Sequence, residues 1–425
     1  INYNNKNWEI DILSKRIISW ISNSKLTYEN SNEIYKNKFN LIIQKQINHL
    51  INEIEKSTGV DNKIVGCAAI ILTGLALNEK EKYLNFGLSL LKKIIDFSFD
   101  NENFPRSRSI RQLVFYLKYF VLIREWLKES QSEIPEYLDE IIFYLGKSYS
   151  ILCQGKVKTL LFNGNQESDN KDFDNYLINH GYKFKNNSFE AGGYVVLKNK
   201  KIILSMDTGH SPEKKFSKDY QCGALSFEII SNNKKLVCNS GYFQKIKHRL
   251  HDISKSSATH STLIIDNQSS CKINKSKMEV ENGLKVWEKK SIVEKNYWNI
   301  SAAHDGYNKR YGIVHKRQIE FFPEKNKFIG LDKIINKKNS KNLNFEIRFH
   351  LEPTTKIMKT QNGKSILIDI DNEGWKFSAE GYQIDMETGL YFGKKNSFIE
   401  NKNLFISGIT QKENHSIKWE FEKIS

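Results

Sequence analysis

Residues 190–209 read EAGGYVVLKNKKIILSMDTG, and residues 222–241 read CGALSFEIISNNKKLVCNSG. Both stretches contain runs of β-branched, aliphatic and aromatic residues, which favour strands, on either side of short turns rich in Asn and Lys. We place the strands at residues 193–197, 202–206 and 225–230 and the turns at 198–201 and 232–234. Because short polar turns join neighbouring antiparallel strands, an antiparallel β region begins here.

The same pattern continues to the end of the chain. Further short strands are predicted at residues 263–265, 316–322, 345–351, 365–370, 375–379 and 417–421. Turn signals recur between them, and no long helical pattern returns. This arrangement predicts a sandwich of antiparallel sheets.

The chain before this region has helical periodicity. Apolar residues recur at helical spacing in segments that we place at residues 9–22, 34–57, 62–78, 80–97, 109–129 and 134–150. Repeated amphipathic helices with short connections are typical of a bundle, a solenoid or a toroid. A chain of 425 residues exceeds one ordinary core. We therefore predict an α+β protein of two domains, with helices in residues 1–185 and a β-sandwich in residues 186–425.

The composition gives weaker indications. The formal net charge is +16, which would attract an anionic partner, although a general bias toward Lys, Asn and Ile would also produce it. No Lys/Arg cluster is interleaved with aromatics, so a nucleic-acid groove is not predicted. The five cysteines are scattered without a CxxC pair, which predicts buried apolar thiols and neither a disulfide framework nor a zinc knuckle.

The sequence predicts no membrane span, because no run of 18 apolar residues occurs. The first residue is Ile1, and a leader removed before it would make the protein periplasmic or secreted. A cytoplasmic location is the alternative. The oligomeric state is not predicted.

Several motifs occur in a fixed order along the β region. They are AGGY at 191–194, DTG at 207–209, LSFE at 225–228, NSG at 239–241, THST at 259–262, HDGY at 304–307, HKR at 315–317 and RFHL at 348–351. In this order they resemble the heparinase II/III-like polysaccharide lyases. The resemblance covers the β region almost fully and the helical region mainly by its layout.

The resemblance implies an (α/α) toroid followed by an antiparallel β-sandwich. It also implies β-elimination of an acidic, uronate-containing polysaccharide bound in a cleft between the domains. A uronate C5 proton becomes removable only when its carboxylate is neutralised by hydrogen bonds or cations. A Tyr or His must then remove it, and a Tyr or His must protonate the leaving oxygen. The alternative is a glycan-binding or structural relative that has lost catalysis.

The chain departs from the family at the positions that the resemblance assigns to a metal. Members carry a His-x-His element before the LSF strand, an Asp on the next strand and the His of the later motif. Here the corresponding residues are Asp219 and Gln221, then Asn239, then His260. Gln and Asn are poor ligands for zinc beside His and carboxylate, so we expect no tight zinc site and no cofactor. Hydrogen bonds joining Gln221, Asn239 and His260 are expected instead.

Residues 242–260 hold an unusual density of groups able to transfer protons near neutral pH: Tyr242, His248, His251 and His260, with Arg249 beside them as a candidate for substrate binding. Some members carry a catalytic Tyr near the position of His251. We therefore expect His251 to act as the base, with His260 orienting the others. A surface loop with incidental histidines is the alternative.

On the helical side, the layout of the family points to Asn62, Asn103 and Arg106 as groups that neutralise the substrate carboxylate. Arg106 and Arg108 could equally be solvated. Asp61 and Asn62 could equally form the N-cap of the helix that follows. In the β region we expect a turn at residues 304–307, and we expect His350 and Trp375 in the core.

Overall fold

A computed structural model describes residues 6–77, 80–155, 158–185, 187–246, 248–274, 276–337, 342–395 and 397–425. Two of the predictions fall on other residues: what precedes Ile1, and residue 78 at the end of a predicted helix. The contacts divide the chain into two compact units. We call residues 1–105 and 112–147 the helical unit, and residues 106–111 and 148–425 the β unit.

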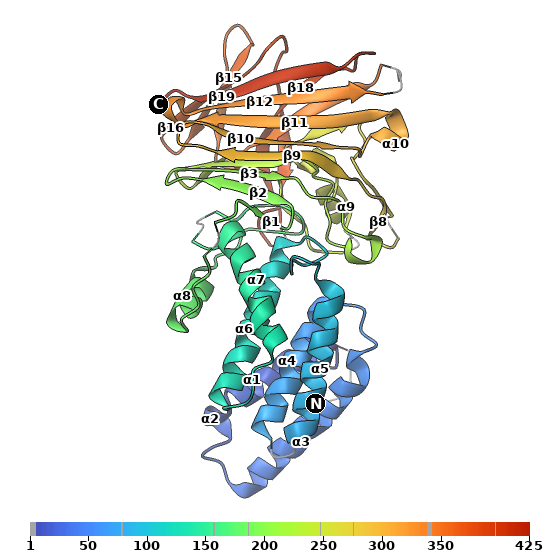
Figure 1. Ribbon diagram of the computed structural model, residues 1–425, viewed down its shortest axis with the longest axis vertical. Coiled ribbons are helices and arrows are strands. Elements are labelled where there is room, and N and C mark those ends of the chain that lie inside the picture. Colours follow the sequence, from blue (N-terminus) through green and yellow to red (C-terminus); the bar gives the residue numbers. More distant parts are fainter. Residues whose placement is uncertain are drawn as a thin grey trace. The chain divides into compact units, whose positions relative to one another are not determined.

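The helical unit is built from antiparallel helices with short connections (Figure 1). The helices are α1 (Ile10–Ser22), α2 (Ser24–Thr27), α3 (Glu33–Ile54), α4 (Val60–Ala76), α5 (Lys80–Ser98), α6 (Ile110–Glu129) and α7 (Glu136–Leu152), whose last turn belongs to the β unit. All of these except the short α2 correspond to a segment predicted from periodicity. None of the described helices is long and apolar enough to cross a membrane.

The central helix is α4, which packs against α1, α3 and α5. Its residues from Ile64 to Gly74 are all buried, because its sequence is apolar on every face. Two glycines bring α4 and α5 close together. A Cβ atom at Gly74 would lie 2.6 Å from the backbone nitrogen of Leu84, and one at Gly87 would lie 2.7 Å from Ile71.

The described residues of the β unit form four antiparallel sheets. One has the order β1-β2-β3-β4-β5 and comprises Glu190–Ala191, Tyr194–Lys198, Ile202–Asp207, Phe227–Ser231 and Lys234–Val237. The largest has the order β14-β15-β16-β19-β12-β11-β10-β9 and comprises Lys356–Lys359, Ser365–Ile370, Glu373–Ala379, His415–Lys423, Lys327–Asn336, Ile313–Phe322, Trp298–His304 and Val286–Val293. A third, β17-β18-β13-β6, comprises Asp385–Tyr391, Ile399–Ile409, Asn344–His350 and Leu263–Ile265, and β7 (Lys272–Asn274) pairs with β8 (Glu279–Asn282).

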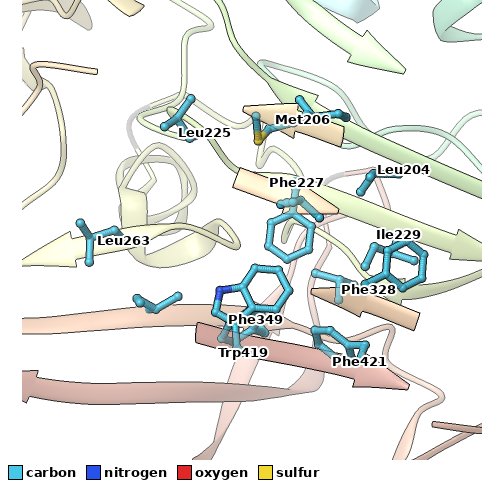
Figure 2. Packing of buried hydrophobic residues seen from close by; sticks show 14 of the residues in the cluster. Leu204, Met206, Leu225, Phe227, Ile229, Leu263, Phe328, Phe349, Trp419 and Phe421 are labelled. Carbon is cyan, nitrogen blue, oxygen red and sulfur yellow. The ribbon is translucent and has the colours of Figure 1, made fainter. Parts of the chain in front are cut away.

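One hydrophobic core joins the three larger sheets, with Trp419 of β19 at its centre (Figure 2). The Trp419 ring stacks on Phe227 of β4 with ring centroids 5.2 Å apart and meets Phe349 of β13 edge-on at 5.0 Å. Gly330 of β12 pairs with Trp419, and a Cβ atom there would lie 2.0 Å from the indole ring. The glycine therefore makes room for the tryptophan. Trp375 is fully buried in the same core, as predicted.

The fold class predicted from sequence is confirmed: helices precede antiparallel sheets. The longest helix that the structure describes after residue 185 is α9 (Arg249–Ser254). We placed the domain boundary at residues 185/186. The change from helix to strand lies between the end of α8 (Lys171–Asn179) and β1, whereas the contacts group residues 148–185 and the short segment 106–111 with the strands.

Arg108 attaches the segment 106–111 to the sheets. Its guanidinium donates to the carboxylate of Asp207 at 2.5 Å and to the backbone oxygens of Gly192 and His210 at 3.0 Å. The Arg108–Asp207 pair is buried. Arg108 is therefore not solvated, which excludes one of the two alternatives considered for it.

Candidate functional site

The segment before α9 and the first turns of that helix carry most of the candidate proton-transfer groups. His248 is the N-cap residue of α9, and its Nδ1 atom accepts a hydrogen bond from the backbone N–H of Leu250 at 3.2 Å. His248 and Arg249 are exposed, whereas Tyr242 and His251 are buried. The alternative of a surface loop with incidental histidines therefore applies only to His248 and Arg249.

His251 is held in one tautomer. Its Nδ1–H donates to the backbone oxygen of Phe243 at 2.7 Å, which leaves the lone pair on Nε2. Burial lowers the pKa of His251, although the hydrogen bond to Phe243 acts in the opposite direction. Its Nε2 atom forms no hydrogen bond within the described part of the chain. His251 is therefore a neutral imidazole with an unoccupied acceptor atom, which is the form that a general base requires.

The ring of Tyr242 lies edge-on to that of His251, with centroids 5.2 Å apart. The Tyr242 hydroxyl donates to Asp219 Oδ1 at 3.1 Å, and Arg111 donates to the other carboxylate oxygen at 3.0 Å. Burial and the neighbouring Asp219 carboxylate raise the pKa of Tyr242 well above its usual value. Tyr242 thus keeps its proton. The Asp219 and Arg111 side chains are 24% and 31% exposed, so this cluster reaches the surface of the β unit.

His260 follows α9 in the chain, directly after the short 3-10 helix of Ser257–Thr259. Its Nδ1 atom bonds to the backbone oxygen of Ser256 at 2.9 Å, while its Nε2 atom is buried without a partner. Burial lowers the pKa of His260 to about 4. The hydrogen bonds of its side chain stay within residues 256–260 and reach none of the other candidates, so an orienting role for His260 remains a prediction.

The helical unit holds two of the predicted binding residues. Asn62 lies in the first turn of α4, and its amide makes no hydrogen bond with any other described residue. The N-cap residue is Gly59, so the alternative that Asp61 and Asn62 form the cap is wrong. Asp61 instead accepts hydrogen bonds from Gln112 at 2.8 Å and from the Tyr116 hydroxyl at 2.7 Å.

Asn103 occupies a tight loop between α5 and α6. The loop is closed by bridge pairing of Phe99 with Pro105 and by the Asp100 carboxylate, and Asn103 has a left-handed φ of 57°. The Phe99 ring packs on Tyr116, the residue that binds Asp61. Tyr116 therefore contacts both the first turn of α4 and the loop that carries Asn103.

Arg106 belongs to the β unit and is half-buried. Its guanidinium lies 5.6 Å from the centroid of the Phe216 ring and 3.9 Å from Glu213 Oε1. The side chain is thus placed over an aromatic face and is not fully solvated.

The comparisons with known proteins agree with this architecture. The sequence profile described as "Heparinase II/III-like, C-terminal" matches residues 183–420, which is more than half of the chain. The chain belongs to the heparinase II/III-like family. No curated protein matches the sequence.

Several solved structures share the fold of this heparinase II/III-like chain. The heparan sulfate lyase HepC from Pedobacter heparinus is 14% identical with a TM-score of 0.75, and the match covers 100% of this chain and 70% of that one. A heparinase III gene product is 14% identical with a TM-score of 0.79, covering 99% and 69%. Another heparinase III is 15% identical with a TM-score of 0.77, covering 98% and 69%. At this identity the likeness establishes the fold of a polysaccharide lyase.

The positions that the heparinase II/III-like family uses for a metal do not fit one here. The Gln221 amide donates to the backbone oxygens of Gly241 and Ser254, and its oxygen accepts from Gly164 N–H. Asn239 donates to the Glu228 carboxylate and accepts from Ser261 N–H. Of the three residues, only His260 has a free lone pair that could bind a metal, on its Nε2 atom. A single nitrogen ligand does not hold a zinc ion.

The prediction that hydrogen bonds join Gln221, Asn239 and His260 is wrong. Each of the three residues bonds to other groups, and none bonds to either of the other two. Within the described residues, no group of three His, Cys, Asp or Glu side chains is placed to hold a metal ion. The absence of a cofactor nevertheless stays a prediction.

The main charged cluster that sequence reasoning missed includes two residues of the HKR motif. Asp332 of β12 accepts hydrogen bonds from Arg317, from His315 at 2.6 Å and from the Trp419 indole at 2.7 Å. All four side chains are fully buried. A signal was present: Arg317 falls on the inward face of an alternating strand, and such an arginine requires a carboxylate partner.

The other expected positions agree with the structure. Residues 305–307 form the turn after β10, and His304 ends that strand with Nε2 3.2 Å from His315 Nδ1. His350 is a buried core histidine, bonded to Ser240 and to the backbone oxygen of Ala258. The five cysteines are buried and free.

Proposed function

We propose that this chain is a polysaccharide lyase that cleaves an acidic, uronate-containing glycan by β-elimination. The observation that carries the proposal is the pair formed by neutral His251 and protonated Tyr242, whose ring centroids lie 5.2 Å apart, in a chain of the heparinase II/III-like family. Its structural relatives include a heparan sulfate lyase. A net charge of +16 is compatible with such a polyanion.

The reaction needs one base and one acid on the same sugar. His251 Nε2 takes the C5 proton, the electron pair of that C–H bond forms the C4=C5 double bond, and the C4–O bond breaks. Tyr242 then protonates the departing oxygen. In the free chain that hydroxyl donates to Asp219 at 3.1 Å, so it must turn from the carboxylate toward the departing oxygen when substrate is bound.

The substrate carboxylate must be neutralised before its α-proton can leave. Arg106 is the candidate for this role in the β unit, because a guanidinium can donate two parallel hydrogen bonds to a carboxylate. Asn62 and Asn103 are further candidates, since each presents an amide without a hydrogen-bond partner among the described residues. His248 and Arg249 are exposed and could bind sulfate or carboxylate groups of a longer chain.

The test is a screen of acidic polysaccharides, including heparan sulfate, in which the ultraviolet absorbance of the unsaturated uronate product is followed. On the substrate identified, His251→Ala should lower turnover by about 10²–10⁴-fold while the chain still folds, as shown by a cooperative thermal transition. Arg106→Ala should mainly raise KM and increase its dependence on salt. His180→Ala, at an exposed helix end, is the matched control and should leave turnover unchanged. Full activity of folded His251→Ala would refute the assignment of the base.

A second candidate is a glycan-binding relative without catalysis. Gln221 and Asn239 favour it, because they replace the metal ligands that the resemblance assigns to active members. This reading predicts that the chain binds an acidic polysaccharide in a retention assay, while no unsaturated product appears with any glycan in the screen.

The proposed substrate, a large polymer, implies action outside the cytoplasm. We therefore propose a periplasmic or secreted location. Fractionation of the source cells followed by immunodetection tests it, and detection only in the cytoplasmic fraction would refute it.

A further inference from the structure

Two buried cysteines from distant parts of the β unit lie against each other. Cys222 precedes β4, and Cys271 precedes β7. The Cys222 thiol donates to the backbone oxygen of Cys271 at 3.6 Å, and the two thiols interact with each other as well. Both are free in this structure. Neither takes part in the proposed elimination.

Hydrogen bonds fix the backbone on both sides of this pair. The Ser257 hydroxyl donates to the Cys222 oxygen at 2.5 Å and accepts from the backbone N–H of Ser270 at 3.0 Å. The Cys222 N–H in turn donates to the backbone oxygen of Lys255 at 2.9 Å. Because Ser257 bonds to both segments, the backbones that carry Cys222 and Cys271 are held next to each other.

A small pocket of about 110 Å³ gives access to the pair. Its lining includes Cys222, Cys271, Lys255 and Asp252. The Lys255 ammonium is buried and donates to the backbone oxygens of Lys218 and Met278, so a positive charge stands beside the thiols. A pocket of this volume admits a molecule the size of water or hydrogen peroxide.

We propose that Cys222 and Cys271 form an oxidisable dithiol, reached through this pocket, whose disulfide locks the segment that carries Tyr242, His251 and His260. This inference does not depend on the proposed function. The disulfide would close a loop between residues 222 and 271, and both α9 and the candidate proton-transfer groups lie inside that loop.

The oxidant is a peroxide. The Cys222 thiolate attacks one peroxide oxygen and forms a sulfenic acid while the other oxygen leaves as water after protonation. The Cys271 sulfur then attacks the sulfenic sulfur, the S–S bond forms, and the hydroxyl group leaves as a second water. Two thiols and one hydrogen peroxide thus give one disulfide and two waters. The hydrogen bond from Cys271 and the charge of Lys255 lower the pKa of Cys222, which makes it the attacking group.

The experiment compares folded protein treated with hydrogen peroxide and folded protein kept in dithiothreitol. Each sample is unfolded, alkylated with iodoacetamide and weighed by mass spectrometry, and its peptides are mapped. The reduced chain should carry five adducts, one for each cysteine, and the oxidised chain two fewer. The linked peptide should contain Cys222 and Cys271. Dithiothreitol should restore all of the adducts.

Matched variants separate this pair from the other buried thiols. Cys153→Ser should still form the link, whereas Cys271→Ser should not. The oxidised wild type should also melt roughly 5–10 °C higher, because the link constrains a loop of this length in the unfolded chain. Peroxide treatment that leaves all thiols of the folded wild type alkylatable, or that links another pair, would overturn the proposal. An unchanged Tm with the link present would refute the locking of the segment.

Discussion

The buried histidines make the stability of the β unit depend on pH, and His350 allows the effect to be measured. His350 lies in β13, where its Nε2–H donates to the Ala258 oxygen at 3.0 Å and its Nδ1 bonds to the Ser240 hydroxyl at 3.2 Å. Burial, with smaller effects from the charges of Arg348 and His260, lowers the pKa of His350 to about 3. The folded protein thus keeps this imidazole neutral in mild acid.

The direction of the effect follows from proton binding. Below the ordinary pKa of 6.5, the unfolded chain binds a proton at residue 350 that the folded chain does not bind until about pH 3. The stabilisation is therefore complete above pH 6.5 and is lost as the pH falls. Between about pH 6.5 and pH 5, at about 1.4 kcal/mol for each pH unit, His350 alone removes about 2 kcal/mol from the free energy of unfolding. His260, whose pKa lies near 4, adds a similar loss.

The assay is urea unfolding of the wild type and of His350→Gln at about pH 7.5 and about pH 5, since glutamine is neutral at both. The variant should be less stable than the wild type at the higher pH. That difference should shrink by about 2 kcal/mol at the lower pH. His180→Gln, at an exposed position, should differ from the wild type equally at both pH values. If the difference in unfolding free energy between His350→Gln and the wild type is also the same at the two pH values, the argument that the folded protein keeps His350 neutral is wrong.

Three further outcomes are expected. Asp332→Asn should lower the free energy of unfolding by about 3–5 kcal/mol, because the buried Arg317 loses its counter-ion. Asp139→Asn breaks the more exposed ion pair with Arg124. In the same urea titration it should lower the free energy of unfolding by less than about 1 kcal/mol. Gly330→Ala should destabilise by roughly 1–3 kcal/mol, because the added methyl group displaces the Trp419 indole. At Gly59 an added Cβ atom would lie 3.6 Å from its nearest neighbour, so Gly59→Ala should not destabilise the protein. Equal losses of unfolding free energy in the two variants would contradict the packing argument. Purified protein should lack stoichiometric zinc, and a chelator should leave its Tm unchanged; one tightly held zinc per chain by elemental analysis would show that Gln221 and Asn239 do not prevent binding.

The helices could be predicted because their apolar residues repeat at 3.6-residue spacing, whatever they pack against. Some strands could not. β12 alternates between inward and outward residues, but its inward positions include Gly330 and Asp332. These two residues break the apolar pattern, and their reason lies on β11 and β19, which contribute Arg317 and Trp419.

In the candidate site, too, some features could be predicted from the sequence and others depend on residues far away in the chain. The sequence could indicate Tyr242 and His251 as proton-transfer groups, because residue types and their density are visible there. It could not give the tautomer of His251, which a backbone oxygen fixes, or the partner of Asp219, since Arg111 is 108 residues away. Pairs such as Cys222 and Cys271 are likewise brought together only by folding. Participation of Asn62 and Asn103 in the reaction remains a prediction.

The attachment of Arg108 to the sheets has a practical consequence for dividing this protein. A fragment that begins at Ser148 would keep every strand but would lack residues 106–111. Asp207 would then be buried without its cation, and the backbone oxygens of Gly192 and His210 would lose their donor. A cut at the obvious end of the helices would therefore remove part of the interior of the sheets, so the two units cannot be separated by a single cleavage that leaves both intact.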